Sequence, residues 1–218
     1  MVINPVTITV YQDVLCAWGY LAELRLEPLE AELGTNVRWN FRPFPLRARS
    51  MSMTCRDKQE WIDEINRARL ENDGGQLKSD LWLQNDCPTS SLRPLLAVEA
   101  AGLQGERSRR RMARALQRAA LEQGINVTRM DVILVLASAL GLDVDGFSMA
   151  WVSTRLRRMI LAEGDRARER GVTGVPTLVV AGRWMICGLR ETLEYRRYIL
   201  MCLKKDTERR AAFERVVH

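Results

Sequence analysis

The fold is decided by the stretch DVLCAWGY at residues 13–20. Residues 6–11, just before it, alternate apolar and polar side chains and predict a strand. The residues after it carry leucines at helical spacing up to Gly34, which predicts a helix with a glycine at its C-terminal end. Cys16 therefore lies at a predicted helix N-terminus, where unpaired N–H groups and the helix dipole favour a thiolate. Such a position lowers the pKa of a thiol and predicts a nucleophile, with a small buried side chain as the alternative.

A second strand is predicted at residues 37–41, where Val, Trp and Phe alternate with polar residues. The order strand, helix, strand predicts a right-handed crossover with the two strands parallel. Near the C-terminus, residues 177–180 and 184–187 predict a hairpin, and a helix is expected from about residue 190. The two ends of the chain thus supply a βαβ unit and a ββα unit.

Between these two units the pattern is helical, without a strand signal. Helices are expected at residues 58–70, 91–101, 106–123, 132–140 and 148–170. The fourth of them follows Thr128 and Asp131, which have the spacing of a capping box. We therefore expect an α/β domain formed by residues 1–56 and 171–218, and an all-helical insertion domain formed by residues 57–170.

A second short motif, GVTGVPT at residues 171–177, precedes the hairpin. Proline is unusual at a strand entrance because it removes a backbone donor. A cis Val175–Pro176 bond would explain it and would expose the Val175 backbone to a substrate chain. A trans proline in a plain turn is the alternative from local sequence, since cis is found in only about 5–6% of X–Pro bonds.

Together, CAWG after the first strand, GVTGVPT before the third and the helical insertion between them resemble the DsbA family of the thioredoxin superfamily. The chain is most similar to the FrnE-like branch of that family. The resemblance implies a thioredoxin-like fold (βαβ + ββα) with a helical insertion. It also implies that Cys16 is the nucleophile and Pro176 the cis-proline beside it, with Ala17, Trp18, Gly19 and Val175 in contact with the substrate.

The chain departs from the usual Cys-x-x-Cys pattern of the family at Gly19. Without a second thiol there, a mixed disulfide on Cys16 must be resolved from elsewhere. Glutathione or a similar small thiol is one candidate, and Cys187 is a weaker one because its separation from Cys16 is expected to be large. Cys55 and Cys87 are expected to pack near the ends of the insertion, and Cys202 in the core.

Composition excludes several other chemistries. The one histidine is His218, the last residue, so histidine-based catalysis and His-ligated metal are not expected, and we predict no metal site. The five cysteines are widely spaced, without the spacing of a disulfide framework or a zinc site. No signal peptide is expected at the start and no transmembrane helix anywhere, which predicts a cytoplasmic protein without membrane contact.

The formal net charge of +6 is concentrated in residues 106–118, which hold six arginines. Arg107, Arg111, Arg114 and Arg118 are spaced to lie on one helical face. We interpret this stripe as a solvated helix face; binding to nucleic acid or an acidic partner is the less favoured alternative.

Three functions follow from these motifs. The favoured one is a monothiol thiol–disulfide oxidoreductase that acts on a protein or small-molecule substrate, with no tightly bound cofactor and glutathione as a co-substrate. The second is a glutathione-dependent transferase or isomerase, because the resemblance extends to kappa-class glutathione transferases and 2-hydroxychromene-2-carboxylate isomerases. The third is a non-catalytic thioredoxin-fold binding module. A homodimer is compatible with all three.

Overall fold

The computed structural model describes residues 5–50 and 52–217, with side chains described up to Arg209; His218 lies outside these residues. Its sheet has the order β2-β1-β3-β4. The central strand β1 (Val6–Gln12) pairs in parallel with β2 (Val37–Pro43) and antiparallel with β3 (Thr177–Val180). β4 (Trp184–Cys187) pairs antiparallel with β3 at the edge. The predicted βαβ and ββα units are confirmed, and they meet along β1 and β3.

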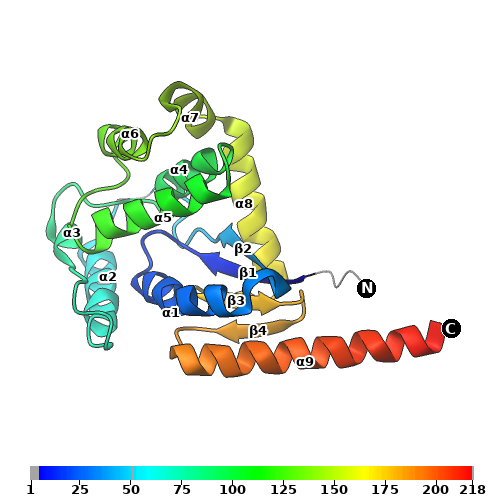
Figure 1. Cartoon of the computed structure of the whole chain (residues 1–218). Coiled ribbons are helices and arrows are strands. Elements are labelled where there is room, and N and C mark those ends of the chain that lie inside the picture. The colour runs from blue at the N-terminus through cyan, green and yellow to red at the C-terminus, as the bar shows by residue number, and fades with distance from the viewer. Residues whose placement is uncertain (1–4, 51, 218) are drawn as a thin grey trace.

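Two helices cover one face of the sheet (Figure 1). α1 (Ala17–Leu33) connects β1 to β2 through a short 3-10 turn, η1 (Gly34–Asn36), and α9 (Thr192–Val217) follows β4. Successive strand residues point to opposite faces. Accordingly Ile8 and Val10 pack in the core shared with α1 and α9, whereas Tyr11 packs in a separate cluster with Ala167 of α8 (Thr154–Glu169).

The insertion between β2 and β3 is helical, as expected. Besides α8 it contains α2 (Cys55–Ala68), α3 (Asp80–Leu83), α4 (Leu92–Gly102), α5 (Glu106–Leu121), α6 (Met130–Ala139) and α7 (Val144–Trp151). Its core also takes in the first turns of α1, through Ala17 and Leu21. The two layers therefore share α1. None of the described helices combines the length and the apolar character that a bilayer crossing requires.

Two details of the insertion differ from the prediction. The single helix expected at residues 148–170 is two helices, because Ser153 adopts an extended conformation and accepts a hydrogen bond from the Leu156 N–H at 3.4 Å, which starts α8. The capping box at Thr128 and Asp131 is wrong: Asp131 pairs with the exposed Arg129 at 2.7 Å, and Thr128 donates to Asn126.

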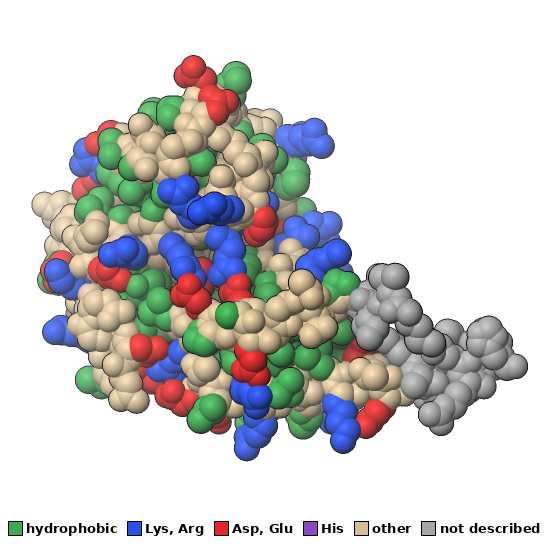
Figure 2. Space-filling model, in the orientation of Figure 1, with side chains coloured by type: hydrophobic (Ala, Val, Ile, Leu, Met, Phe, Trp, Pro, Cys, Tyr) green, Lys and Arg blue, Asp and Glu red, His purple; other side chains and the backbone are tan. Residues whose placement is uncertain are grey.

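The interpretation of the arginine stripe also needs correction. Figure 2 shows Arg and Glu side chains side by side across the middle of the molecule, over α5 and α1. Arg114 of α5 pairs with two glutamates of α1, Glu23 at 3.2 Å and Glu27 at 3.1 Å. The neighbouring Arg110 pairs with Glu30, which also lies on α1. Part of the arginine-rich segment is therefore an interface between α5 and α1 rather than a solvated face.

Candidate active site

Cys16 is the N-cap residue of α1. Its backbone is extended, and its Sγ accepts a hydrogen bond from the Gly19 N–H at 3.3 Å. Only 5% of the residue is exposed. The reactive atom expected from the sequence is thus also the atom that caps the helix.

The GVTGVPT segment meets Cys16 from the other end of the chain. The Val175–Pro176 bond is cis, and the Cys16 thiol donates to the Val175 carbonyl with an S···O distance of 3.5 Å. Two contacts hold this segment: Thr177 Oγ1 donates to the Gly174 carbonyl at 2.7 Å, and the Gly188 N–H donates to the Pro176 carbonyl at 2.8 Å. Two motifs that lie 159 positions apart in sequence therefore form one site.

The thiol is not activated in the way that its place at a helix start suggested. Burial raises the pKa of Cys16 to about 12, and this outweighs the lowering effect of the Gly19 N–H. The negative charges of Asp13 and Glu64 act in the same direction as burial. The expected lowering of the pKa is therefore wrong for this structure, in which Cys16 is a protonated donor to Val175.

Asp13 is a buried carboxyl group beside the site that the sequence analysis did not single out. It is fully buried, and its carboxylate oxygens accept the N–H groups of Leu15 at 2.9 Å and Leu46 at 2.8 Å. Burial raises its pKa. Asp13 ties the loop before Cys16 to the segment after β2. The position of this acidic residue three places before Cys16, in the stretch at residues 13–20, was the sequence signal for this role.

A cleft of about 700 Å³ opens over Cys16. The first turn of α1, the loop before Pro176, the segment after β2 and helix α2 all line it. Its walls include the apolar Trp18, Trp61 and Ile65 and charged groups of both signs: Arg47, Glu60, Asp63, Glu64 and Arg67. Which helix of the insertion lines the cleft had no signal in the sequence, because it depends on how the insertion folds back over the sheet.

Trp18 forms one wall of the cleft. Its Nε1 donates to Glu64 of α2 at 2.5 Å, and its ring packs partly buried against the insertion core. Cys16 rather than Trp18 caps the helix, so the Trp18 side chain serves as an apolar wall of the cleft. Ala17 and Val175 line the same cleft. Gly19 is buried beneath it, next to Cys16.

Among the described residues, Cys16 is the one cysteine that lines this cleft, and all five cysteines are free. Cys87 and Cys202 are buried in the cores of the two layers, and Cys55 is exposed at the start of α2. Cys187 is exposed and lies opposite Thr177 in the β3–β4 ladder, at the Pro176 end of the sheet. Within the described part of the chain, no group of His, Cys, Asp and Glu side chains is arranged to hold a metal ion.

Residues 7–199 match the family model described as the DSBA-like thioredoxin domain. The chain belongs to this family. Among curated proteins it is 31% identical over 183 residues to a ClpXP adapter protein SpxH of Halalkalibacterium halodurans. That match covers 81% of this chain and 58% of the adapter, so the chain spans little more than half the length of this relative.

Solved structures confirm the DsbA-like fold. A candidate protein disulfide isomerase from Nitrosomonas europaea superposes with a TM-score of 0.82 at 18% identity, over 92% of this chain and 98% of that one. The cytosolic disulfide reductase DsbM from Pseudomonas aeruginosa, solved with GSH, gives a TM-score of 0.71 at 20% identity, over 91% and 99%. A 2-hydroxychromene-2-carboxylate isomerase gives 0.64 at 20% identity, over 94% and 98%. The expected similarity to DsbA-family proteins and to 2-hydroxychromene-2-carboxylate isomerases is thus confirmed at the level of fold.

Proposed function

We propose that this protein is a cytoplasmic thiol–disulfide oxidoreductase that works through Cys16 alone and forms mixed disulfides that a small thiol resolves. The observation that carries the proposal is the position of Cys16 Sγ, which lies in a cleft against the Val175 carbonyl with a glycine in the place of a second cysteine. Glutathione is the small thiol that we favour.

The chemistry balances without a metal or a bound cofactor. The Cys16 sulfur attacks one sulfur of a substrate disulfide, forms a mixed disulfide and breaks the original S–S bond. The leaving sulfur takes the electron pair and the proton that Cys16 loses. A glutathione thiolate then attacks the mixed disulfide, which restores Cys16 and leaves the substrate sulfur joined to glutathione.

In this proposal, substrate docking promotes the ionisation of the Cys16 thiol, which the site without substrate disfavours. A substrate N–H that donates to the Val175 carbonyl displaces the Cys16 S–H from it. The Gly19 N–H stays in place to stabilise the thiolate that forms when the S–H leaves the Val175 carbonyl.

Charged side chains of both signs in the cleft match the groups of glutathione in kind. Arg47 and Arg67 are the partners for its two carboxylates, and Glu60, Asp63 and Glu64 for its ammonium group. Binding exchanges the Arg67–Glu64 ion pair and the Arg47–Asp57 pair at 3.6 Å for these contacts. The DsbM structure with GSH shows that a protein of this fold accommodates the tripeptide.

The test uses oxidised glutathione and intact-protein mass. Cys55 and Cys187 are exposed, so both are first replaced by serine to remove competing thiols. We expect this double variant to gain one glutathione at a rate that saturates with oxidised glutathione, and to gain none once Cys16→Ser is added. An adduct that survives Cys16→Ser, or a rate that never saturates, contradicts the proposal.

A binding role is the second candidate, because the curated relatives are ClpXP adapters named SpxH. In that case the fold presents a surface to a protein partner and Cys16 has no turnover. Binding of a partner protein that Cys16→Ser leaves unchanged, together with the absence of glutathione adducts, would favour it.

A further inference from the structure

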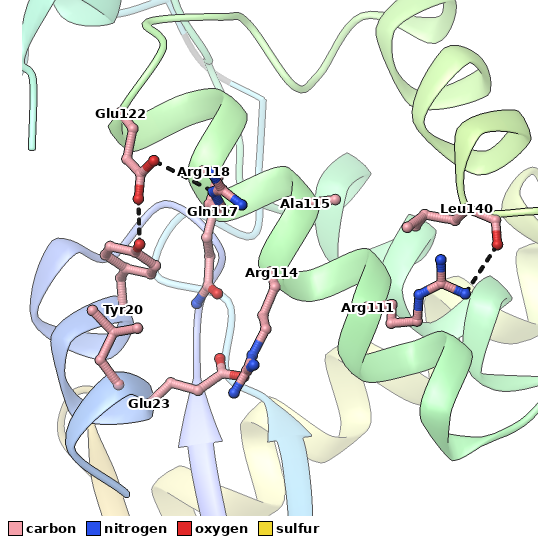
Figure 3. Close-up of a pocket in the computed structure, with 10 residues that line it drawn as sticks. Tyr20, Glu23, Arg111, Arg114, Ala115, Gln117, Arg118, Glu122 and Leu140 are labelled. Atoms are coloured by element: carbon pink, nitrogen blue, oxygen red, sulfur yellow. Dashed lines mark hydrogen bonds and ion pairs between the residues drawn. The ribbon is translucent and has the colours of Figure 1, made fainter. Parts of the chain in front are cut away.

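A second pocket of about 440 Å³ lies between α1 and α5 (Figure 3). It shares no lining residue with the cleft over Cys16. α1 contributes Tyr20, Glu23 and Leu24, and α5 contributes the larger part of the wall, including three arginines of the arginine-rich segment. The proposed redox chemistry makes no use of this pocket.

Gln117 is the unusual feature of the pocket. The residue is 1% exposed, and neither its amide nitrogen nor its amide oxygen has a hydrogen-bond partner among the described residues. Figure 3 shows its side chain extending from α5 into the gap beside Tyr20 and Glu23. A buried amide without partners destabilises the fold. One donor and one acceptor side by side are the complement of a peptide group.

The charges around Gln117 favour a single negative charge on the ligand. The lining side chains Arg111, Arg114 and Arg118 against Glu23 and Glu122 give three formal positive charges and two negative, which leaves one positive. Arg114 and Arg118 pair with these glutamates, whereas Arg111 donates to the Leu140 carbonyl at 3.2 Å. Arg118 makes one hydrogen bond among the described residues, from Nε to Glu122 at 3.4 Å, which leaves its terminal nitrogens available for a carboxylate. A dianionic phosphate would exceed the charge that the pocket balances.

The rest of the lining is apolar: Leu24, Ala115 and Leu140. We propose that this pocket binds the C-terminal end of a peptide, with its last peptide group on Gln117, its free carboxylate at Arg118, and an apolar side chain against Leu24 and Leu140. Capture of a terminal carboxylate is a recurring mode of peptide recognition. A free short peptide and the exposed C-terminus of a protein both supply this chemistry.

The experiment compares two pools of acetylated tripeptides, randomised at all three positions, on the immobilised full-length chain. One pool ends in a free carboxylate and the other in a carboxamide. We expect selective retention of free-acid peptides, identified by mass spectrometry. Equal retention of the two pools, or no retention of either, overturns the proposal.

Variants then locate the site with the peptide that is retained best. Gln117→Leu and Arg118→Gln should each weaken its binding at least about tenfold. Arg107→Gln is the matched control, because Arg107 shares the stripe on α5 but does not line the pocket. Gln117→Leu should also keep or raise the thermal midpoint without peptide, since it removes a buried amide that lacks partners. Unchanged affinity in Gln117→Leu contradicts the proposal.

Two further experiments identify the source of the peptide and test whether the pocket is independent of the redox function. The same tripeptide sequence is placed at the C-terminus of a carrier protein: binding of the carrier supports a protein terminus, and binding of the free peptide alone supports a small peptide ligand. Glutathione addition to Cys16 should proceed unchanged in Gln117→Leu, so failure of the redox function and failure of this site are separable.

Discussion

Gly19 lies directly against Cys16. A Cβ built on Gly19 would stand 3.5 Å from the Cys16 Cβ and 3.7 Å from its Sγ, with no neighbour closer than these. Disulfide-bonded cysteines have Cβ atoms about 3.5–4.5 Å apart. The site therefore keeps the geometry of a two-cysteine centre although the second thiol is missing.

Gly19→Cys is expected to create an intramolecular disulfide with Cys16, because the new Cβ fits without displacing a neighbour and lies at disulfide distance from the Cys16 Cβ. After mild oxidation the intact protein should be two hydrogen atoms lighter, and neither sulfur should react with iodoacetamide. Gly19→Ser, which fills the same space without a thiol, is the control. Two alkylated sulfurs after oxidation would show that the first turn of α1 cannot close this bond.

Mixed-disulfide formation at Cys16 should accelerate with pH. Because the pKa of the thiol is raised to about 12, the thiolate is the minor form at neutral pH and its fraction grows about tenfold for each pH unit up to that value. At oxidised glutathione well below saturation, the rate of glutathione addition between pH 7 and pH 9, followed by mass on the peptide that contains Cys16, should rise accordingly. A plateau below pH 8 would mean that the thiol is already ionised there.

Asp13→Ala should destabilise the fold by about 1–3 kcal/mol, because it leaves the buried N–H of Leu15 and the part-buried N–H of Leu46 without an acceptor. Asp13→Asn, which keeps one acceptor oxygen, should cost less. Urea unfolding of the two variants provides the measurement. Equal losses for both would assign the effect to the charge rather than to the hydrogen bonds.

Arg110→Ala should lower the free energy of unfolding by about 1–2 kcal/mol. Arg110 pairs with Glu30 of α1, and its guanidinium lies 4.4 Å from the ring centroid of Phe41. Arg118→Ala is the comparison, since Arg118 is 64% exposed and pairs within its own helix, and it should change stability by less than about 0.5 kcal/mol. Urea unfolding measures both; equal effects would show that the α1–α5 ion pairs contribute nothing measurable.

The strands and most helices could be predicted from the sequence because their signals are local. Alternation gave β1 and β2 close to their observed bounds, and Gly34 ends α1 with a positive φ of 50°. The break at Ser153 was missed because both flanking segments are amphipathic helices, and only the cap separates them. The four-residue α3 is too short to show a period.

The site could be predicted in part, since Cys16 and Pro176 lie in two recognisable motifs. The pKa of Cys16 could not be predicted, because it depends on how deeply the insertion and the Val175 loop bury the sulfur. The same holds for Gln117. Its isolation depends on the packing of α5 against α1, which no spacing within α5 reveals.

Cys16 performs two tasks with one atom, as helix cap and as candidate nucleophile. Any covalent adduct on this sulfur withdraws electron density from the acceptor of the Gly19 amide. The first turn of α1 should then exchange its amide hydrogens faster in the modified protein than in the free thiol. The oxidation state of a single sulfur therefore changes how readily the first turn of α1 unfolds locally, and both layers of the molecule share this helix.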